Sequence, residues 1–390
     1  MTDRDIFLVC NNVDELGGVQ RWAHHLAGLF AARGHRVTLV GVTSADDPHR
    51  YAHNAPYRVE VLHEQWRPPA LAWRPASVRA RLNMRARVRD RRRTVALRRG
   101  VARLSELLRE ARPGGVVIAA QVWAMEWVRL ADTRGLKVIG MSHESYTATR
   151  RSSRYRRVRE FYAGADRMLA LTSEDADAWA RSGMTNADHI PNPLPLEPSP
   201  HPDLLAPVVA CVGRLSYEKG VDMALEAWAE VGAARPGWRL RVYGSGPEEG
   251  ALRELAASLG VSGSVEFRGP TADVEAALAE ASVFLLPSRQ EGFPMSLLEA
   301  MACGLPSVAF DCAPGVRELL TDGRDGLLVA PGHTTALAAA LDRLIGDPDL
   351  RRALAAEAVG SVTRFRPGAV LDRWERLFAL LHRGGHPSIT

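Results

Sequence analysis

Two acidic side chains in the second half of the chain have a spacing that suits the binding of an elongated anionic ligand. Glu291 and Glu299 end the run Glu-Gly-Phe-Pro-Met-Ser-Leu-Leu-Glu. Pro294 favours the first turn of a helix, so we expect Glu291 in the preceding loop and Glu299 about a turn and a half inside. These carboxylates cannot share a proton, but they can reach opposite ends of a ligand whose anionic group lies at the helix N-terminus. The structural alternative is a surface acid and a buried, salt-bridged Glu.

A second candidate motif is Gly213-Arg214-Leu-Ser-Tyr-Glu-Lys219-Gly220, directly after a predicted strand. An arginine fork and a lysine point charge five residues apart, with glycines at both ends, suit a diphosphate. The chain has 48 arginines but only two lysines, Lys137 and Lys219. The presence of one of these two lysines in the motif favours a binding role for the loop over a purely solvated one.

The elements that must position these residues alternate between strands and helices. Asp5–Cys10 is a short buried strand, Gly17-Gly18 a turn, Val19–Ala32 a helix with apolar residues at helical spacing, and Val37–Val42 the next strand. This is a βαβ unit, which opens a parallel sheet. Further predicted strands are Arg58–Leu62, Val116–Ala119, Lys137–Met141 and Arg167–Leu171. One α/β domain therefore fills residues 1–190.

A proline-rich linker follows, because seven of the residues 191–207 are proline. The α/β pattern then restarts over residues 208–366, and residues 367–390 hold an amphipathic helix expected to pack back on the first domain. Strands are predicted at Val208–Val212, Arg239–Tyr243, Ser264–Arg268, Val283–Leu286, Ser307–Phe310 and Gly326–Val329. The fold class is α/β, with two facing Rossmann-like doubly wound domains and a ligand-binding cleft between them.

Length and composition exclude several classes of protein. At 390 residues the chain exceeds the usual size of one hydrophobic core, which indicates two domains. The longest uncharged apolar run, Gly114 to Met125, is too short to span a bilayer, so an integral membrane protein is excluded. The N-terminus has no basic segment before its first apolar run, which is not the pattern of a secretory signal. We therefore expect a cytoplasmic location, which includes peripheral contact with the inner face of the membrane. The cysteines Cys10, Cys211, Cys303 and Cys312 show no spacing typical of disulfides or zinc.

The arginines are concentrated in the first domain. From Arg67 to Arg112 there are 15 arginines against three acids, a local charge of +12, so the rest of the chain carries −7 of the total +5. Leu97, Val101, Leu104 and Leu108 share one helical face within this segment. Such a basic amphipathic helix can rest on an anionic membrane surface, bind an anionic acceptor or be solvated. Nucleic-acid binding is disfavoured, because Trp73 is the segment's only aromatic residue and no nucleic-acid motif is present.

Together these motifs resemble the retaining family 4 (group 1) glycosyltransferases of the GT-B fold. The resemblance covers nearly all of the second domain, and in the first it rests on Gly17-Gly18 and His143. The matching pieces are Gly17-Gly18, His143, Pro191-Asn192-Pro193, Arg214 with Lys219, Tyr243-Gly244-Ser245-Gly246-Pro247, Pro287-Ser288, the two glutamates Glu291 and Glu299, Ala300-Met301-Ala302-Cys303-Gly304 and Gly326-Leu327-Leu328-Val329.

The resemblance implies a nucleotide sugar, UDP- or GDP-linked, as donor substrate, with no cofactor and no metal. Glu299 would bind the ribose, Arg214 and Lys219 the diphosphate, and Glu291 hydroxyls of the transferred sugar, which His143 would contact from the first domain. Catalytic roles are thereby expected for His143, Glu291, Arg214 and Lys219. Donor-binding roles are expected for Gly17, Gly18, Gly213, Arg214, Lys219, Gly292, Phe293, Pro294, Met295, Ser296 and Glu299. The acceptor is not identified. We expect an anionic or membrane-associated one, such as an envelope glycan or a lipid-linked or teichoic-type polymer. A natural product is the alternative.

Other patterns compete with this interpretation. Asp175-Ala-Asp177 and Asp347-Pro-Asp349 imitate a metal-binding pair, but their predicted positions, in a helix and in a loop between helices, argue against that role. Gly244-Ser-Gly246 half-resembles a dinucleotide fingerprint, yet it is not in the first βα turn, so an oxidoreductase is disfavoured. Arg317 stands where relatives commonly have proline. A phosphorylase or a nucleotide-sugar epimerase on the same scaffold is the alternative function.

Overall fold

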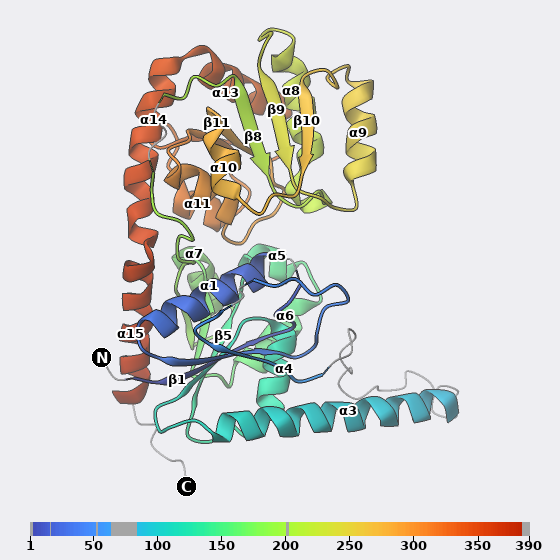
Figure 1. Cartoon of the computed structure of the whole chain (residues 1–390), viewed down its shortest axis with the longest axis vertical. Coiled ribbons are helices and arrows are strands. Elements are labelled where there is room, and N and C mark those ends of the chain that lie inside the picture. The colour runs from blue at the N-terminus through green and yellow to red at the C-terminus, as the bar shows by residue number, and fades with distance from the viewer. Residues whose placement is uncertain (1–2, 16, 52–53, 64–83, 200–202, 384–390) are drawn as a thin grey trace. The chain divides into compact units, whose positions relative to one another are not determined.

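A computed structural model describes residues 3–15, 17–51, 54–63, 84–199 and 203–383. The chain forms two compact α/β units (Figure 1). Unit 1 takes Met1–His143, Thr149–Ile190 and Leu371–Thr390, and unit 2 takes Glu144–Ala148 and Pro191–Val370. The proposed domain boundaries and the cleft between domains stay predictions.

Unit 1 is built on a seven-stranded sheet with the order β3-β2-β1-β4-β5-β6-β7, and every pairing is parallel. The strands are β1 (Asp5–Cys10), β2 (Arg36–Gly41), β3 (Arg58–Val61), β4 (Val116–Ala119), β5 (Lys137–Met141), β6 (Arg167–Ala170) and β7 (Ala187–His189). The strand β1 is buried along its whole length, as expected for a central parallel strand covered on both faces. The order of the strands reverses between β1 and β4, which makes this the switch point of unit 1.

The helices of unit 1 cover this sheet with apolar faces. They are α1 (Gly18–Ala32), α3 (Met84–Arg109), α4 (Val122–Leu130), α5 (Tyr146–Arg150, partly assigned to unit 2), α6 (Arg154–Tyr162), α7 (Ser173–Arg181) and the end of α15 (Pro367–Arg383). The rings of Trp374 and Phe378 in α15 lie 5.7 and 5.8 Å from that of Phe30 in α1. Nε2 of His35 lies 2.6 Å from Oε1 of Glu375. These contacts fix the last turns of α15 on unit 1.

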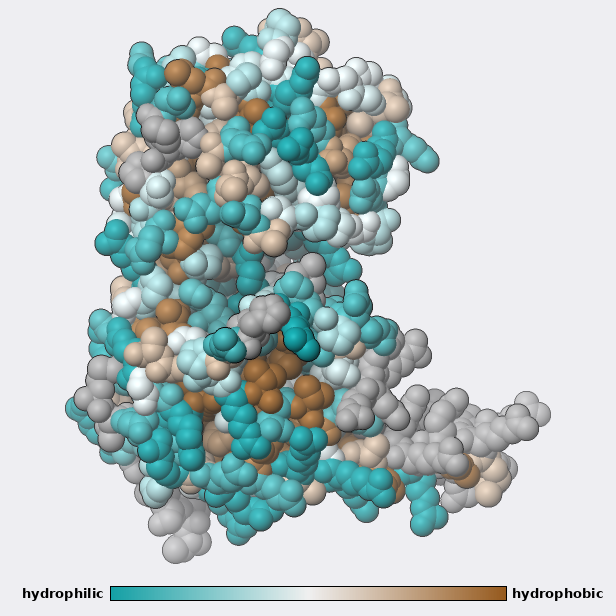
Figure 2. Space-filling model, viewed as in Figure 1, coloured by the Kyte–Doolittle hydropathy of each residue, from teal (hydrophilic) through white to brown (hydrophobic). Residues whose placement is uncertain are grey.

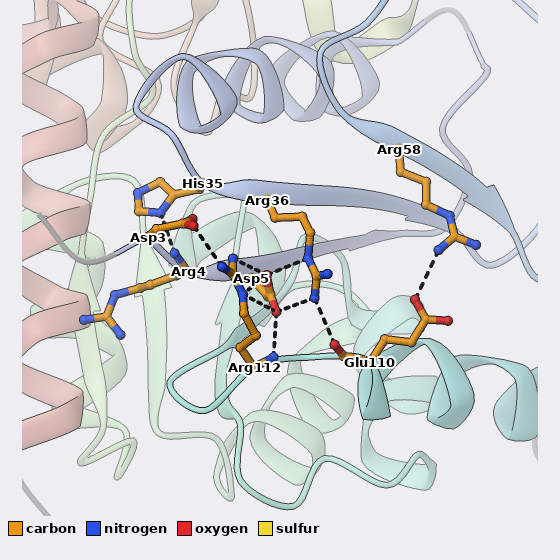
Figure 3. Close-up of polar contacts among 8 residues, drawn as sticks. All are labelled: Asp3, Arg4, Asp5, His35, Arg36, Arg58, Glu110 and Arg112. Atoms are coloured by element: carbon orange, nitrogen blue, oxygen red, sulfur yellow. Dashed lines mark hydrogen bonds and ion pairs between the residues drawn. The ribbon is translucent and has the colours of Figure 1, made fainter.

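A charged network lies at the amino ends of β1 and β2 (Figure 3). Asp5 is buried, and its carboxylate accepts paired hydrogen bonds from Arg36 at 2.7 and 2.6 Å. Arg112, just after α3, donates to the same carboxylate through its backbone N–H at 2.6 Å and its guanidinium at 2.8 Å. Although burial raises the pKa of Asp5, the hydrogen bonds from Arg112 and Arg36 outweigh it and lower the pKa to about 2. The network ties the end of α3 to the sheet.

Unit 2 has a six-stranded parallel sheet with the order β10-β9-β8-β11-β12-β13. Its strands are β8 (Val208–Val212), β9 (Arg239–Tyr243), β10 (Val265–Gly269), β11 (Val283–Leu286), β12 (Ser307–Phe310) and β13 (Leu327–Val329). Its helices are the 3-10 turn η1 (Tyr217–Lys219), α8 (Val221–Gly232), α9 (Glu249–Ser258), α10 (Val274–Ala279), α11 (Met295–Ala302), α12 (Pro314–Leu319), α13 (Thr334–Gly346), α14 (Pro348–Ser361) and the 3-10 turn η2 (Val362–Phe365). The switch point of unit 2 lies between β8 and β11.

The proline-rich segment is packed against unit 2 over its first half. Residues 191–199 form neither helix nor strand, and Asn192 and Leu194 are buried. The backbone N–H of Leu194 donates to the carbonyl of Phe365 at 2.8 Å, and that of Ser199 donates to Ala302 at 2.9 Å. These single hydrogen bonds hold an extended chain in place, which suits a segment whose prolines cannot donate.

The structure differs from the predicted elements of unit 1 in one helix and one strand. Helix α3 begins at Met84, well before the predicted apolar face at Leu97, and β7 was not predicted. Residues 67–83 of the arginine-rich segment lie outside the described residues. None of the helices in the described part of the chain combines the length and the apolar character that a membrane span requires.

Candidate functional site

Both predicted motifs of unit 2 lie at its switch point. The loop Gly213–Gly220 follows β8, and the loop from Pro287 to Glu291 follows β11, the neighbouring strand. The carboxyl ends of parallel strands meet at one edge of the sheet, and open α/β sheets bind their ligands where the strand order reverses. The fold therefore brings the cationic loop and the acidic loop together.

Lys219 and Glu291 contact each other directly across this switch point. Nζ of Lys219 lies 2.7 Å from Oε1 of Glu291, and Oγ of the buried Ser288 donates to the same oxygen at 2.7 Å. The Glu291 side chain is only 6% exposed, whereas that of Lys219 is 31% exposed. Oε2 of Glu291 makes no hydrogen bond to a described residue. One carboxylate oxygen is thus fixed by the protein, and the other is available to a ligand hydroxyl.

Arg289 is a further charged residue of this site, which the sequence analysis did not identify. Its guanidinium makes paired hydrogen bonds of 2.7 and 2.5 Å to the carboxylate of Asp222 in α8. It also lies 4.3 Å from the ring centre of the exposed Tyr217. The hydrogen bond to Asp222 is the main reason why the pKa of Arg289 is raised. Arg289 thereby ties the loop after β11 to the loop and helix after β8.

Glycines allow the loops of the site to touch backbone to backbone. A Cβ on Gly220 would lie 2.1 Å from the carbonyl oxygen of Pro287, and Gly220 has a φ of +63°, which favours glycine. A Cβ on Gly244 would lie 1.8 Å from the carbonyl oxygen of Gly213, and one on Gly315 would lie 1.9 Å from that of Gly292. Side chains at these positions would push the loops apart. The spacing of the charged groups therefore depends on these contacts.

Arg214 is the exposed cation of the site. No hydrogen bond or ion pair joins its guanidinium to a described residue, although its charge helps to lower the pKa of Glu218, after the larger effects of that residue's hydrogen bonds. Its neighbour Gly213 lies beside the aliphatic part of Lys219, because a Cβ on Gly213 would lie 3.7 Å from Cδ of Lys219. Arg214 is free to bind an anion.

The helix α11 places the remaining predicted residues of unit 2. Pro294 immediately precedes the helix rather than lying in its first turn, and Glu299 is 2% exposed within it. The side chain of Phe293 packs edge to face on Phe365 at 5.5 Å, so only its backbone can reach a ligand. Nδ2 of Asn192 lies 3.5 Å from Sδ of Met295. Gly292 and Ser296 are partly exposed at the start of this helix, where N–H groups lack intrahelical partners.

Gly17 and Gly18 lie at the switch point of unit 1, where α1 begins. The backbone N–H of Gly17 donates to the Tyr51 hydroxyl at 3.0 Å, and that hydroxyl donates to the carbonyl of Glu15 at 2.6 Å. A Cβ on Gly17 would lie 2.5 Å from Oε1 of Gln20, whereas Gly18 has open space around it. The tyrosine thus holds the glycine turn, a contact that the sequence analysis did not find.

His143 follows β5 and packs edge to face on Trp22 of α1, with ring centres 4.4 Å apart. Its Nε2 is buried and has no hydrogen-bond partner among the described residues. Burial lowers the pKa of His143 to about 4, because the charged imidazole would lose its hydration. The ring is therefore neutral at physiological pH, with one nitrogen not engaged by the protein.

The acidic pairs that imitate a metal site lie at the N-termini of helices instead. Asp175 is in the first turn of α7, where its backbone N–H donates to Oγ1 of the N-cap residue Thr172 at 3.1 Å. Asp347 is itself the N-cap of α14 and accepts from the N–H of Leu350 at 2.9 Å. Over the described residues, no group of three or more His, Cys, Asp or Glu could hold a metal ion. The predicted site residues thus divide into two sets: Gly17, Gly18 and His143 in unit 1, and the others in unit 2.

Comparison with known proteins assigns the family. The model of glycosyl transferases group 1 matches residues 206–347, and that of glycosyltransferase family 4 matches residues 16–198. An exopolysaccharide phosphotransferase of Streptomyces coelicolor is 38% identical over 218 residues, which are 55% of this chain and 23% of that protein. A lipopolysaccharide core biosynthesis glycosyltransferase of Rhizobium meliloti is 35% identical over 175 residues, 45% of this chain and 50% of that one.

A solved structure extends the comparison to the fold. A TarM mutant of S. aureus in complex with fondaparinux, alpha-GlcNAc-glycerol and UDP has a TM-score of 0.79 at 13% identity, covering 96% of this chain and 99% of that one. The two sheets of six and seven parallel strands agree with this likeness. The chain therefore belongs to the family 4, group 1 glycosyltransferases and has their two-domain α/β GT-B fold.

Proposed function

We propose that the chain transfers a hexose from a UDP- or GDP-sugar to an acceptor hydroxyl, with retention of configuration and without a metal ion. The observation that carries this proposal is the contact of Lys219 and Ser288 with one oxygen of Glu291, beside the unpaired cation of Arg214. Two cations at a switch point suit a diphosphate, and a carboxylate with one available oxygen suits sugar hydroxyls.

In this proposal the cations act on the leaving group. Arg214 and Lys219 offset the negative charge that the diphosphate gains as the bond to the sugar breaks, and the N-terminus of α11 adds its partial positive charge. Because these charges are built into the chain, no metal ion is required for the same purpose. Glu299 binds the ribose, and Glu291 holds the transferred sugar through Oε2.

The residues of unit 1 act on the sugar and the acceptor. His143 is neutral, so it can donate or accept one hydrogen bond at its unengaged nitrogen without adding charge. The turn at Gly17 and Gly18 lets a ligand come close to the backbone. A neutral imidazole and an open glycine turn suit the recognition of hydroxyl groups.

We further propose that the acceptor is an anionic or membrane-associated envelope glycan, and that the enzyme acts at the surface of a membrane. Support comes from the exopolysaccharide and lipopolysaccharide proteins among the relatives and from the glycosylated glycerol and UDP named for the TarM complex. The arginine-rich segment of unit 1 provides the charge for such a contact.

A thermal-shift screen with UDP-, GDP- and ADP-sugars tests the donor. A ligand that binds the native state raises the melting temperature, and we expect one uridine or guanosine sugar to do so. Transfer to acceptors is then measured with and without EDTA, and we expect equal rates. The absence of stabilisation by all nucleotides would contradict the proposed function, and a strict requirement for magnesium would contradict the metal-free mechanism.

A further inference from the structure

Helix α3 has two halves that differ in their surroundings. Its second half packs on unit 1 through Leu97, Leu104 and Leu108, all of which are buried. A Cβ on Gly100 would lie 2.4 Å from the ring of Trp127 in α4, so glycine permits this close packing. The network of Figure 3 fixes the end of the helix, because Arg36 donates to the carbonyl of Glu110 at 2.9 Å.

The first half of α3 extends beyond the other elements of unit 1 (Figure 1). It exposes three apolar side chains, Met84 at 66%, Val88 at 50% and Val95 at 41%. With the exposed Arg91 they stand at spacings of four, three and four residues, which places all four on one helical face. Figure 2 shows hydrophobic atoms among hydrophilic ones on this part of the molecule.

This exposed apolar face is not a continuation of the core. The buried Leu104 lies nine positions after Val95, and nine positions are two and a half turns of an α-helix. The outward apolar face therefore lies opposite the leucines that pack on unit 1. Covering Met84, Val88 and Val95 requires a surface outside the described part of the chain.

The charge of the helix indicates what that surface is. Met84–Arg109 holds ten arginines against Asp90 and Glu106, a net charge of +8. Arg103 pairs with Glu60 at 2.8 Å, whereas the exposed Arg91, Arg98 and Arg99 make no ion pair with a described residue. Unpaired cations beside apolar side chains match an anionic bilayer, whose headgroups attract arginine and whose acyl boundary accepts apolar groups.

We propose that the exposed face of α3, formed by Met84, Val88, Arg91 and Val95 with Arg98 and Arg99, docks on an anionic lipid bilayer. A nucleic acid would use the cations but would leave the apolar side chains in water. The inference deepens the proposed action at a membrane and rests on that function for its purpose. The binding itself requires no sugar transfer, so the two can be tested separately.

Sedimentation of the full chain with vesicles tests the proposal. Wild type is expected to bind vesicles of 30% phosphatidylglycerol in phosphatidylcholine, to release them as salt screens the charges, and to bind pure phosphatidylcholine at least tenfold more weakly. The variant R91Q/R98Q/R99Q is expected to bind anionic vesicles about 100-fold more weakly, at roughly fivefold for each arginine near the surface. M84Q/V88Q/V95Q is expected to lose about tenfold.

Two matched controls separate this face from general surface effects. R253Q/R324Q/R352Q removes the same charge from exposed arginines of unit 2, and L130Q/L205Q/L380Q replaces three exposed leucines elsewhere. Both controls should bind vesicles within twofold of wild type. All replaced side chains are exposed, and circular dichroism should show unchanged folding.

Equal binding by the α3 variants and their controls would overturn the proposal. So would binding to a 30-base-pair DNA duplex that excludes vesicles, because the helix would then be a nucleic-acid surface. Vesicle binding that depends on α3 in a protein that binds no nucleotide would support the docking surface and contradict the proposed function alone.

Discussion

The two switch points of the molecule share one topology and differ in chemistry. In unit 2 the strand ends carry charged groups in direct contact, Lys219 with Glu291 and Arg289 with Asp222. In unit 1 they carry amides and an imidazole: the backbone N–H of Asn11 donates to Oε1 of Gln121 at 3.0 Å, and His143 is neutral. The same strand order thus carries Lys–Glu and Arg–Asp pairs in unit 2, and in unit 1 a neutral imidazole and amide contacts beside the acidic residues Asp14 and Glu15.

The difference also concerns how the loops are held. The charged loops of unit 2 are locked by backbone contacts at glycines such as Gly244 and Gly315. The glycine turn of unit 1 is held by a side chain, the hydroxyl of Tyr51. A fixed arrangement of charges is what electrostatic stabilisation of a leaving group requires. We infer that unit 2 binds the nucleotide sugar and that unit 1 contacts the transferred sugar and the acceptor.

Removal of the charged groups of unit 2 should have the largest effect. Glu291→Ala and Lys219→Ala should each reduce sugar transfer at least tenfold while the fold persists, because each removes a charged contact worth about 1.5–3 kcal/mol. Initial rates of transfer and circular dichroism measure both quantities. Turnover like that of wild type in both variants would contradict the site assignment.

The stability of the fold should depend on the charged network at the amino ends of β1 and β2. Asp5→Asn should cost about 2 kcal/mol at pH 7, since the pKa of Asp5 lies near 2 in the folded chain against 3.8 unfolded. Because the pKa of Asp5 is lowered in the folded chain, its carboxylate stabilises the fold fully above pH 4. This stabilisation is lost as the pH falls from 4 to 2, so the free energies of unfolding of the variant and wild type should converge over that range. Urea denaturation measures the difference.

The matched control is Asp132→Asn, which removes an acid paired with Arg134 two residues away at the surface. It should cost less than Asp5→Asn, because the pair is local and hydrated. Nucleotide affinity should be unchanged in both. An equal loss of stability in the two variants would show that the buried network adds nothing.

A methyl group at Gly315 should disturb the anion site without removing a charge. Gly315→Ala places Cβ against the carbonyl of Gly292, so the loop that carries Glu291 must move, and we expect about tenfold weaker binding of UDP, or about 1.4 kcal/mol. Isothermal titration calorimetry measures the affinity. Gly250→Ala is the control, because its Cβ meets nothing within 4 Å. Identical affinities in the two variants would argue against the proposed role of the backbone contacts.

The smallest effect is expected in unit 1. His143→Ala removes one neutral hydrogen bond, worth about 1 kcal/mol, and should lower kcat about fivefold while UDP binding stays within twofold. Burial lowers the pKa of His143 to about 4, so its charge should not alter kcat between pH 8 and pH 5. A pH profile of kcat for wild type and variant tests this. A limb near pH 6.5 that disappears in the variant would contradict it.

The sequence predicted the parts of the site that depend on local order. Lys219 and Glu291 each follow a strand in a recognisable run, so their position at the edge of a sheet could be inferred. The pairing of Arg289 with Asp222 joins residues 67 positions apart, and the contact of Tyr51 with Gly17 joins two loops. Such contacts depend on tertiary structure, and no local sequence pattern predicts them.

The arginine-rich segment shows the same limit for secondary structure. An apolar face at helical spacing predicted a helix near Leu97–Leu108, where the helix packs on unit 1. The preceding residues from Met84 have no such inward face, although arginine and alanine favour helix. Periodicity detects the part of a helix that is buried against its own domain.

The chain's two lysines provide the most direct test of the central claim, that the switch point of unit 2 binds a nucleoside diphosphate. Lys219 contacts Glu291 at this site, and Lys137 pairs with Asp166 in unit 1 at 3.1 Å. Titration calorimetry with UDP should show at least tenfold weaker binding for Lys219→Ala and a change within twofold for Lys137→Ala. Equal affinities in the two variants, or a larger loss in Lys137→Ala, would contradict the account.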